Sequence, residues 1–102
     1  MSSGYVPLEE IFSSKGRVKV LKVLLEAHEL NITEIVKRSE LNHTVVLSHL
    51  EALVKAGLVI EKRFGRIRIF KVNESDPRIK LLRELFKLDE ELCRASTPSG
   101  GT

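Results

Sequence analysis

The chain of 102 residues lacks most of the features that stabilise small secreted domains or anchor membrane proteins. Its only cysteine, Cys93, cannot form an intramolecular disulfide or a multi-cysteine zinc site. No apolar run approaches the roughly 18 residues of a bilayer-spanning helix. The first ten residues lack the basic and apolar regions of a secretory signal. These absences predict a cytoplasmic protein with no membrane partner.

Glutamine and tryptophan are absent, and methionine occurs only at position 1, whereas Lys, Glu and Arg are abundant. Few thermolabile residues and many charged ones favour a thermophilic source. The 42% of apolar residues can form one small core, and the chain is too short for the usual two-domain enzymes. It contains no P-loop and no glycine-rich dinucleotide turn, and its three histidines are dispersed. We therefore expect no catalytic residue, no cofactor and no metal site.

The net charge of +3 comes from two short segments. Residues 15–25 contain four basic residues and no acid, and residues 58–72 contain five basic residues and one acid. Between them, residues 26–57 contain three basic and five acidic residues. A basic stripe next to acidic segments is expected of a nucleic-acid-binding surface, although a solvated helix face gives the same pattern.

Hydrophobic periodicity predicts a mainly α chain with a small β-hairpin, an α+β class. The expected helices cover residues 8–12, 15–27, 34–38, 42–56 and 79–93. The expected N-caps are Ser13 or Ser14, Thr33 and Asn42. The expected buried stripe of the fourth helix is Val46, Leu50, Leu53 and Val54. Gly57 then occupies the C′ position, where glycine is common.

The β-rich runs 58–63 and 66–72 predict the hairpin, with Phe64-Gly65 as its turn. Residues 30–32 can add one strand rung. Two helices separated by a short turn at residues 39–41 have the spacing of a helix-turn-helix. A hairpin with a basic tip after them predicts a winged helix-turn-helix: a three-helix core, a wing and a C-terminal helix. Such a fold places its second helix in the major groove and its wing on the backbone or minor groove.

The run His-Leu-x-x-Leu-x-x-Ala-Gly-Leu-Val from His49 to Val59 resembles the recognition helix and its exit in ArsR/MarR-like winged-helix transcription regulators, especially archaeal ones. Residues 18–25 are similar to their first core helix, and residues 65–72 to their wing. The resemblance covers about residues 14–93 and implies a homodimeric regulator that dimerises through terminal helices. Two departures are the Leu47 that replaces the usual Ser and the missing paired cysteines of the metal-sensing members. The second departure argues against metal sensing of that type.

The expected DNA-binding residues come from three parts of the chain. The recognition helix supplies Asn42, His43, Thr44, Val45, Leu47 and Ser48, of which Asn42 acts first as a cap. The wing supplies Arg63, Arg66 and Arg68. Further backbone contacts are expected from Lys15 and Arg17, with Lys37 or Arg38. Because the helix carries no Arg or Gln and its only Asn is the cap, we expect modest direct readout of bases, with shape and backbone contacts supplying much of the affinity.

The last helix has more apolar surface than one small domain needs. Leu81, Leu85, Leu88 and Leu92 follow a 4-3-4 spacing, and Ile79, Leu82 and Phe86 line a neighbouring face. One face of this helix is expected to pack on the domain's own core, and the other face is expected to pack on a second copy of the chain. The expected dimer interface is Ile79, Leu82, Leu85, Phe86, Leu88 and Leu92. The alternative is a helix buried entirely in its own domain, and Cys93 near the seam offers a cross-dimer disulfide under oxidation.

The sequence thus predicts four regions: a flexible N-terminus (1–7), a DNA-binding winged helix-turn-helix (8–73), a dimerisation helix (74–94) and a disordered tail (95–102). The predicted function is sequence-specific binding of double-stranded DNA as a homodimeric transcription regulator, with repression by promoter occupancy as the commoner mode and activation as the alternative. The alternative is a winged-helix protein-interaction module of a larger transcription or assembly complex. The basic charge on the wing favours the first.

Overall fold

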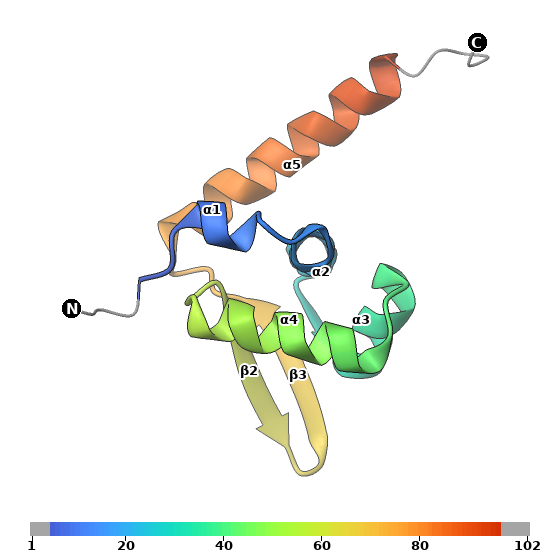
Figure 1. Cartoon of the computed structure of the whole chain (residues 1–102), viewed down its shortest axis with the longest axis vertical. Coiled ribbons are helices and arrows are strands. Elements are labelled where there is room, and N and C mark those ends of the chain that lie inside the picture. Colours follow the sequence, from blue (N-terminus) through green and yellow to red (C-terminus); the bar gives the residue numbers. More distant parts are fainter. Residues whose placement is uncertain (1–4, 97–102) are drawn as a thin grey trace.

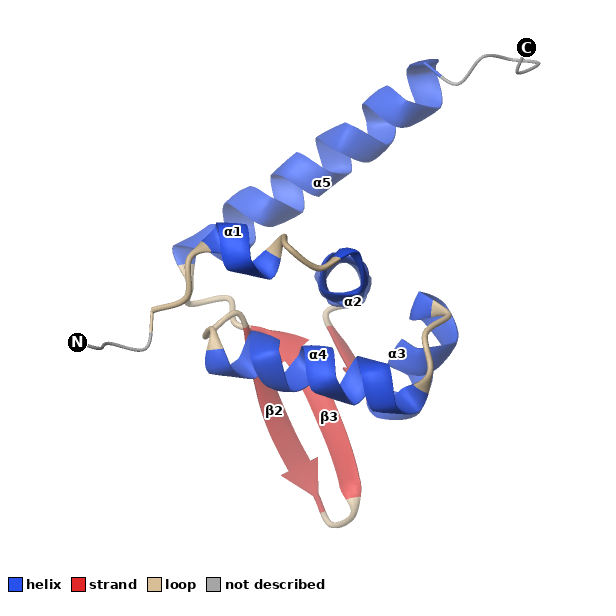
Figure 2. Cartoon of the chain, viewed as in Figure 1, coloured by secondary structure: helices blue, strands red, loops and turns tan. Residues whose placement is uncertain are grey.

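The computed structural model describes residues 5–96, which form helices around a small antiparallel sheet (Figures 1 and 2). The elements in chain order are α1 (Leu8–Ile11), α2 (Lys15–Ala27), β1 (Glu29–Asn31), α3 (Ile32–Ser39), α4 (His43–Lys55), β2 (Val59–Phe64), β3 (Ile67–Val72) and α5 (Pro77–Ser96). This order confirms the predicted winged helix-turn-helix, in which α3 and α4 are the helix pair and β2 and β3 are the wing. Residues 1–4 of the predicted N-terminus and 97–102 of the predicted tail lie outside the described part.

Side-chain caps define where three of the helices begin. The Ser14 hydroxyl accepts a hydrogen bond from the Arg17 amide at 3.2 Å, and Asn42 Oδ1 accepts one from the Val45 amide at 2.9 Å, as predicted. The predicted Thr33 cap is wrong. Asn31 Oδ1 caps α3 by accepting from the Glu34 amide at 2.9 Å, so this helix begins at Ile32.

The strand order in the sheet is β1-β3-β2. β1 pairs Leu30 with Phe70, and the wing pairs Val59 with Val72 through to Phe64 with Ile67. The predicted turn at Phe64-Gly65 is therefore wrong by one residue: Phe64 belongs to β2, and the turn is Gly65-Arg66. Gly65 has a φ of 63°, a left-handed value that suits glycine in a two-residue hairpin turn.

The core fills the space between α2, α3, α4, the inner face of the sheet and the first half of α5. Val46, Leu50 and Leu53 of α4 are fully buried, as predicted. Val54 is 37% exposed, so its predicted burial is wrong. It follows Leu53 by one residue and therefore points about 100° further round the helix.

α5 is held to the body by its first half, and Arg78 anchors its base. Arg78 donates to the carbonyl oxygens of Val6 and Ala56, both at 3.1 Å, and makes a two-pronged ion pair with Asp76. The Arg78 side chain lowers the pKa of the Asp76 carboxyl by hydrogen bonding to it. Every residue from Lys87 to Ser96 is exposed, and the helix projects away from the body on the side opposite the wing (Figure 1). Ala95 and Ser96 are helical, which corrects the predicted start of the tail at residue 95.

Candidate nucleic-acid interface

The outward face of α4 carries the residues predicted to meet the major groove. His43, Thr44 and Ser48 are exposed, whereas Val45 and Leu47 are half-buried. All of them lie in the first half of the helix, which is the half that reaches base edges in helix-turn-helix proteins. The Asn42 side chain is exposed, and its Oδ1 accepts from the Val45 amide. The cap therefore orders the N-terminal end of α4, where the other predicted DNA-binding residues lie.

The turn between α3 and α4 is held by Ser39, the only buried polar residue among residues 5–96. Its hydroxyl donates to the Val36 carbonyl at 3.4 Å and accepts from the Leu41 amide at 3.3 Å. Glu40 completes the turn in the left-handed region, with φ 63°. These contacts fix the angle between α3 and α4 and therefore the orientation of α4 on the domain.

An open groove of about 390 Å³ joins the start of α4 to the wing. Its lining residues are Asn31, Ile32, Thr33, His43, Arg66, Ile67 and Arg68. The structure thus brings together three of the predicted DNA-binding residues, His43, Arg66 and Arg68. The sequence prediction missed the contribution of Asn31 and Thr33, which depends on β1 pairing with β3 and so placing the start of α3 beside the wing.

Two of the three wing arginines share one carboxylate. Arg68 makes a two-pronged ion pair with Glu61, at 2.7 and 3.2 Å, and Arg63 Nε donates to the same carboxylate at 3.1 Å. The hydrogen bond from Arg68 is the main reason that the pKa of Glu61 lies below its usual value. The same pair raises the pKa of Arg68. Glu61 therefore offsets part of the charge that the sequence assigned to the wing.

Arg66 differs from the other wing arginines. It is exposed in the hairpin turn and has no acidic group within 4 Å among residues 5–96. Lys62, on the outer face of the wing, pairs with Glu29 at 3.4 Å. The positive charge that is available at the tip of the wing is therefore mainly that of Arg66.

The other basic segment does not reach this groove. Lys15, Lys19 and Lys22 line an open hollow with Phe12, Val18 and Phe86, on the side of the molecule where α1 and α5 lie (Figure 1). The Lys22 ammonium lies 5.5 Å from the centre of the Phe86 ring. Lys15 is thus placed apart from the wing.

Arg17 is directed into the body of the molecule. It is half-buried, and its Nη1 donates to the carbonyl oxygen of Glu10 at the end of α1, at 3.2 Å. This hydrogen bond gives Arg17 a structural contact in place of the phosphate contact that the sequence suggested. Of the two remaining candidates, Lys37 is exposed, and Arg38 forms an ion pair with Glu34 at 3.6 Å.

His49 is packed against the start of α2. It is half-buried, its Nδ1 has no hydrogen-bond partner, and a Cβ atom on Gly16 would lie only 2.8 Å from its Nε2. Gly16 therefore permits the close approach of α2 to α4. Burial, and then the charge of Arg17, lower the pKa of His49. The residue is a packing element of the helix pair.

The exposed face of α5 matches the 4-3-4 seam. Leu81, Leu85, Leu88 and Leu92 are each at least half exposed. Ile79 and Leu82, which the sequence placed in the dimer interface, are buried in the chain's own core, so their assignment is wrong. Phe86 is half-buried against the core, with its ring centre 6.2 Å from that of Phe12.

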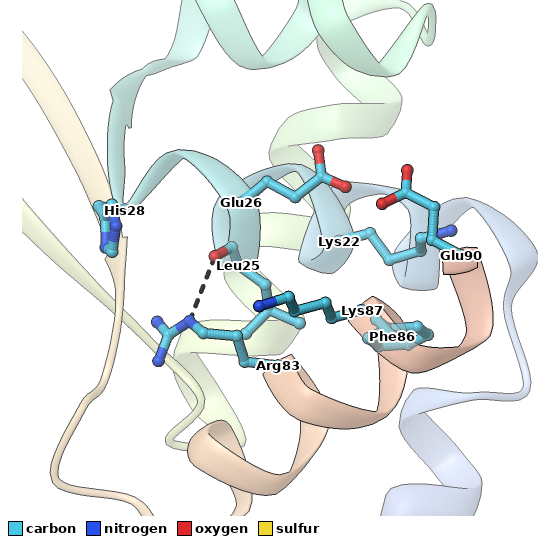
Figure 3. A pocket seen from close by; sticks show the side chains of 8 residues that line it. All are labelled: Lys22, Leu25, Glu26, His28, Arg83, Phe86, Lys87 and Glu90. Carbon is cyan, nitrogen blue, oxygen red and sulfur yellow. Dashed lines mark hydrogen bonds between the residues drawn. The ribbon is translucent and has the colours of Figure 1, made fainter. Parts of the chain in front are cut away.

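A third hollow, a pocket of about 360 Å³, lies between α2 and α5 (Figure 3). Its rim mixes the basic residues Lys22, Arg83 and Lys87 with the acids Glu26 and Glu90. Arg83 Nε donates to the Leu25 carbonyl at 3.4 Å, the contact drawn in Figure 3, while its other nitrogens hold Glu74. Within residues 5–96, no three His, Cys, Asp or Glu side chains gather as a metal site would require.

These elements define the class of protein by fold: a winged helix-turn-helix. Residues 14–61, from the N-cap of α2 into β2, match the model of the family described as bacterial regulatory protein, arsR family. This segment is therefore similar to the helix-turn-helix domain of that family. A search of curated proteins finds no match. None of the helices in the described range is both long enough and apolar enough to cross a bilayer.

Solved structures support the same fold over most of the chain. Reduced HlyU from Vibrio cholerae N16961 is 24% identical, with a TM-score of 0.67 over 89% of this chain and 86% of that one. The AntR antimony-specific transcriptional repressor is 18% identical, with a TM-score of 0.73 over 87% and 78%. A homodimeric winged helix-turn-helix DNA-binding domain from Mycobacterium bovis, a possible ArsR-family transcriptional regulator, is 22% identical, with a TM-score of 0.66 over 85% and 80%.

Proposed function

We propose that this chain is a cytoplasmic, non-enzymatic transcription regulator of the ArsR type that binds double-stranded DNA sequence-specifically and represses by occupying a promoter. The observation that carries the proposal is the groove shared by His43, Arg66 and Arg68. It places the start of an exposed helix beside a basic hairpin, which is the arrangement that reads a major groove while contacting the adjoining backbone. The thermophilic source that the composition favours and the archaeal source that the resemblance implies are part of the same proposal.

In this proposal the start of α4 enters the major groove. His43, Thr44 and Ser48 supply hydrogen-bonding groups, and Val45 and Leu47 supply apolar contacts for a thymine methyl group. Arg66 holds the backbone or the minor groove, and Arg63 and Arg68 join it when they exchange Glu61 for phosphate. Lys37, exposed at the end of α3, is a further phosphate contact. Lys15 and Arg17 are not part of the revised interface.

We infer that two copies associate through α5. Every residue of its outer half, Lys87–Ser96, is exposed, and isolated helices shorter than about 12 residues are marginal in water. Pairing the seam of Leu81, Leu85, Leu88 and Leu92 with that of a second copy supplies the missing contacts. The arrangement also makes residues 74–96 the dimerisation region and residues 8–73 the DNA-binding region. A two-fold dimer reads two half-sites about one helical turn apart.

Binding-site selection from random duplex DNA, followed by footprinting and a mobility shift at several salt concentrations, tests the proposal. We expect enrichment of a pseudo-palindrome and affinity that falls as salt rises, because phosphate contacts release counterions. Absence of a shift at low salt would overturn DNA binding and favour the protein-interaction alternative. Sedimentation of wild type and of the double variant Leu85→Glu, Leu88→Glu tests the dimer, with Val54→Glu on α4 as the exposed apolar control.

A further inference from the structure

The tip of the wing carries two large apolar side chains. Phe64 and Ile67 face each other across the last rung of the hairpin, and they are 60% and 55% exposed. Both belong to the outer face of the sheet, because they alternate with Arg63 and Arg68, which face the same way as the buried Phe70. Neither residue contributes to the core, so the stability of the domain does not explain them.

Two basic side chains lie beside the apolar pair, and one of them, Lys62, also pairs with Glu29. Arg66 lies in the turn directly between Phe64 and Ile67, and the Lys62 ammonium lies 5.9 Å from the centre of the Phe64 ring. Ile67 and Arg66 also line the groove that leads to His43. Ile67 thus connects the apolar tip with the proposed DNA-binding groove. The charge beside it suits a polyanion rather than an uncharged protein surface.

We propose that Phe64 and Ile67 form an apolar wedge that presses into the minor groove and bends the DNA, an inference that rests on the proposed function. Minor-groove proteins insert Phe or Ile side chains against a base step, unstack it partly and bend the duplex. Arg66 is placed to enter the same groove, where a narrow A·T-rich tract attracts arginine. The wedge selects sites that carry a flexible pyrimidine–purine step, such as TA, beneath the wing.

The test uses the duplex that the wild-type chain enriches from random DNA, labelled at both ends for energy transfer. We expect bound wild type to shorten the end-to-end distance and the double variant Phe64→Ser, Ile67→Ser to restore most of it. The double variant is expected to bind this duplex about tenfold more weakly. In a repeated selection it should lose the pyrimidine–purine step beneath the wing while keeping the bases read by α4.

Two variants act as controls. Ile60→Ser removes an apolar residue that is 39% exposed on the same face but at the base of the wing, and it should leave the bend unchanged. Phe64→Leu keeps an apolar tip and should keep most of the bend. Circular dichroism and thermal unfolding of each variant show that the comparison is made between folded proteins.

Several outcomes would overturn the wedge. One is wild type that binds its selected duplex without bending it, and another is a double variant that bends it equally. A third is a double variant whose oligomeric mass changes in the absence of DNA, because the pair would then serve a protein contact. Each of these leaves DNA binding intact. Absence of any duplex binding by wild type would instead remove the proposed function, and the wedge with it.

Discussion

The two basic segments have similar charge in the sequence but different surroundings in the structure. Residues 15–25 lie on α2, where Lys22 covers the Phe86 ring and Arg17 donates to the end of α1. Residues 58–72 form the wing, where Glu61 holds Arg63 and Arg68 and leaves Arg66 exposed at the tip. Local charge therefore does not locate a nucleic-acid surface by itself. The partners of each side chain and the groove that it lines are what distinguish the segments.

The largest difference between the segments is expected when each loses one charge. Arg66→Ala should weaken duplex binding about tenfold and reduce the magnitude of the salt slope by about one per protomer, because it removes the uncompensated charge at the tip. A titration of one labelled duplex at several salt concentrations measures both quantities. Lys22→Ala is the matched control on α2 and should leave them unchanged. Equal losses in the two variants would refute the distinction between the segments.

A smaller effect, of opposite sign, is expected from Glu61→Gln. The amide keeps the size of the side chain but removes the charge that holds Arg63 and Arg68, so phosphate no longer competes with a carboxylate for them. We expect about threefold tighter binding to random duplex DNA and a steeper salt dependence. Glu90→Gln, which removes an acid from a surface ion pair with Arg94 on α5, is the control. Weaker binding by Glu61→Gln would mean that the carboxylate is needed to position the arginines.

The same ion pairs mark a limit of sequence analysis. A turn at residues 64–65 would have paired Arg63 with Arg66 and Glu61 with Arg68, whereas the observed turn pairs Arg63 with Arg68 and leaves Arg66 in the turn itself. A shift of one residue in the turn thus changes every cross-strand partner. The composition of the hairpin predicted its existence and its basic tip, but not that Arg66 would lie in the turn while Arg63 and Arg68 share Glu61.

Elements with strong local determinants were predictable. The helical spacing of α2 and α4, the Asn42 and Ser14 caps and the Gly57 C′ position depend on neighbouring residues, and the structure has them as expected. The start of α3 depends on a distant contact. Asn31 and Thr33 are both good caps, and the pairing of β1 with β3 places Asn31 at the end of a strand, where it caps the helix. The site residues at this junction were missed for the same reason.

The lysines of α2 provide a weaker test of the comparison. The double variant Lys15→Gln, Lys19→Gln should change duplex affinity by less than about twofold, because both residues line the hollow beside α1 and α5 and the Lys19 ammonium already pairs with Glu40 at 3.9 Å. Mobility shifts at low and moderate salt measure the change. The pair Lys37→Gln, Arg66→Gln removes two charges near the helix pair and the wing instead. If the affinity changes more than twofold in the α2 variant alone, DNA binds at α2 and not at the wing, and the proposed interface is wrong.

The smallest expected effect concerns the pH dependence of stability, where Arg17 acts on a histidine rather than on DNA. Burial and the charge of Arg17 lower the pKa of His49 in the folded chain. In the unfolded chain an ordinary histidine takes up its proton near pH 6.5. The unfolded state therefore binds more protons as the pH falls below about 6.5, and the folded state loses stability down to the lowered pKa.

Replacing His49 should remove this contribution. We expect His49→Gln to lose less unfolding free energy than wild type between pH 7.5 and pH 5.5, as measured by urea denaturation at each pH. His43→Gln, on the exposed face of the same helix, controls for the loss of a histidine as such. Arg17→Met should weaken the pH dependence in part, because burial remains after the charge is gone. Identical pH profiles for wild type and His49→Gln would show that Arg17 and burial do not act on His49, and the charge of α2 would then need another role.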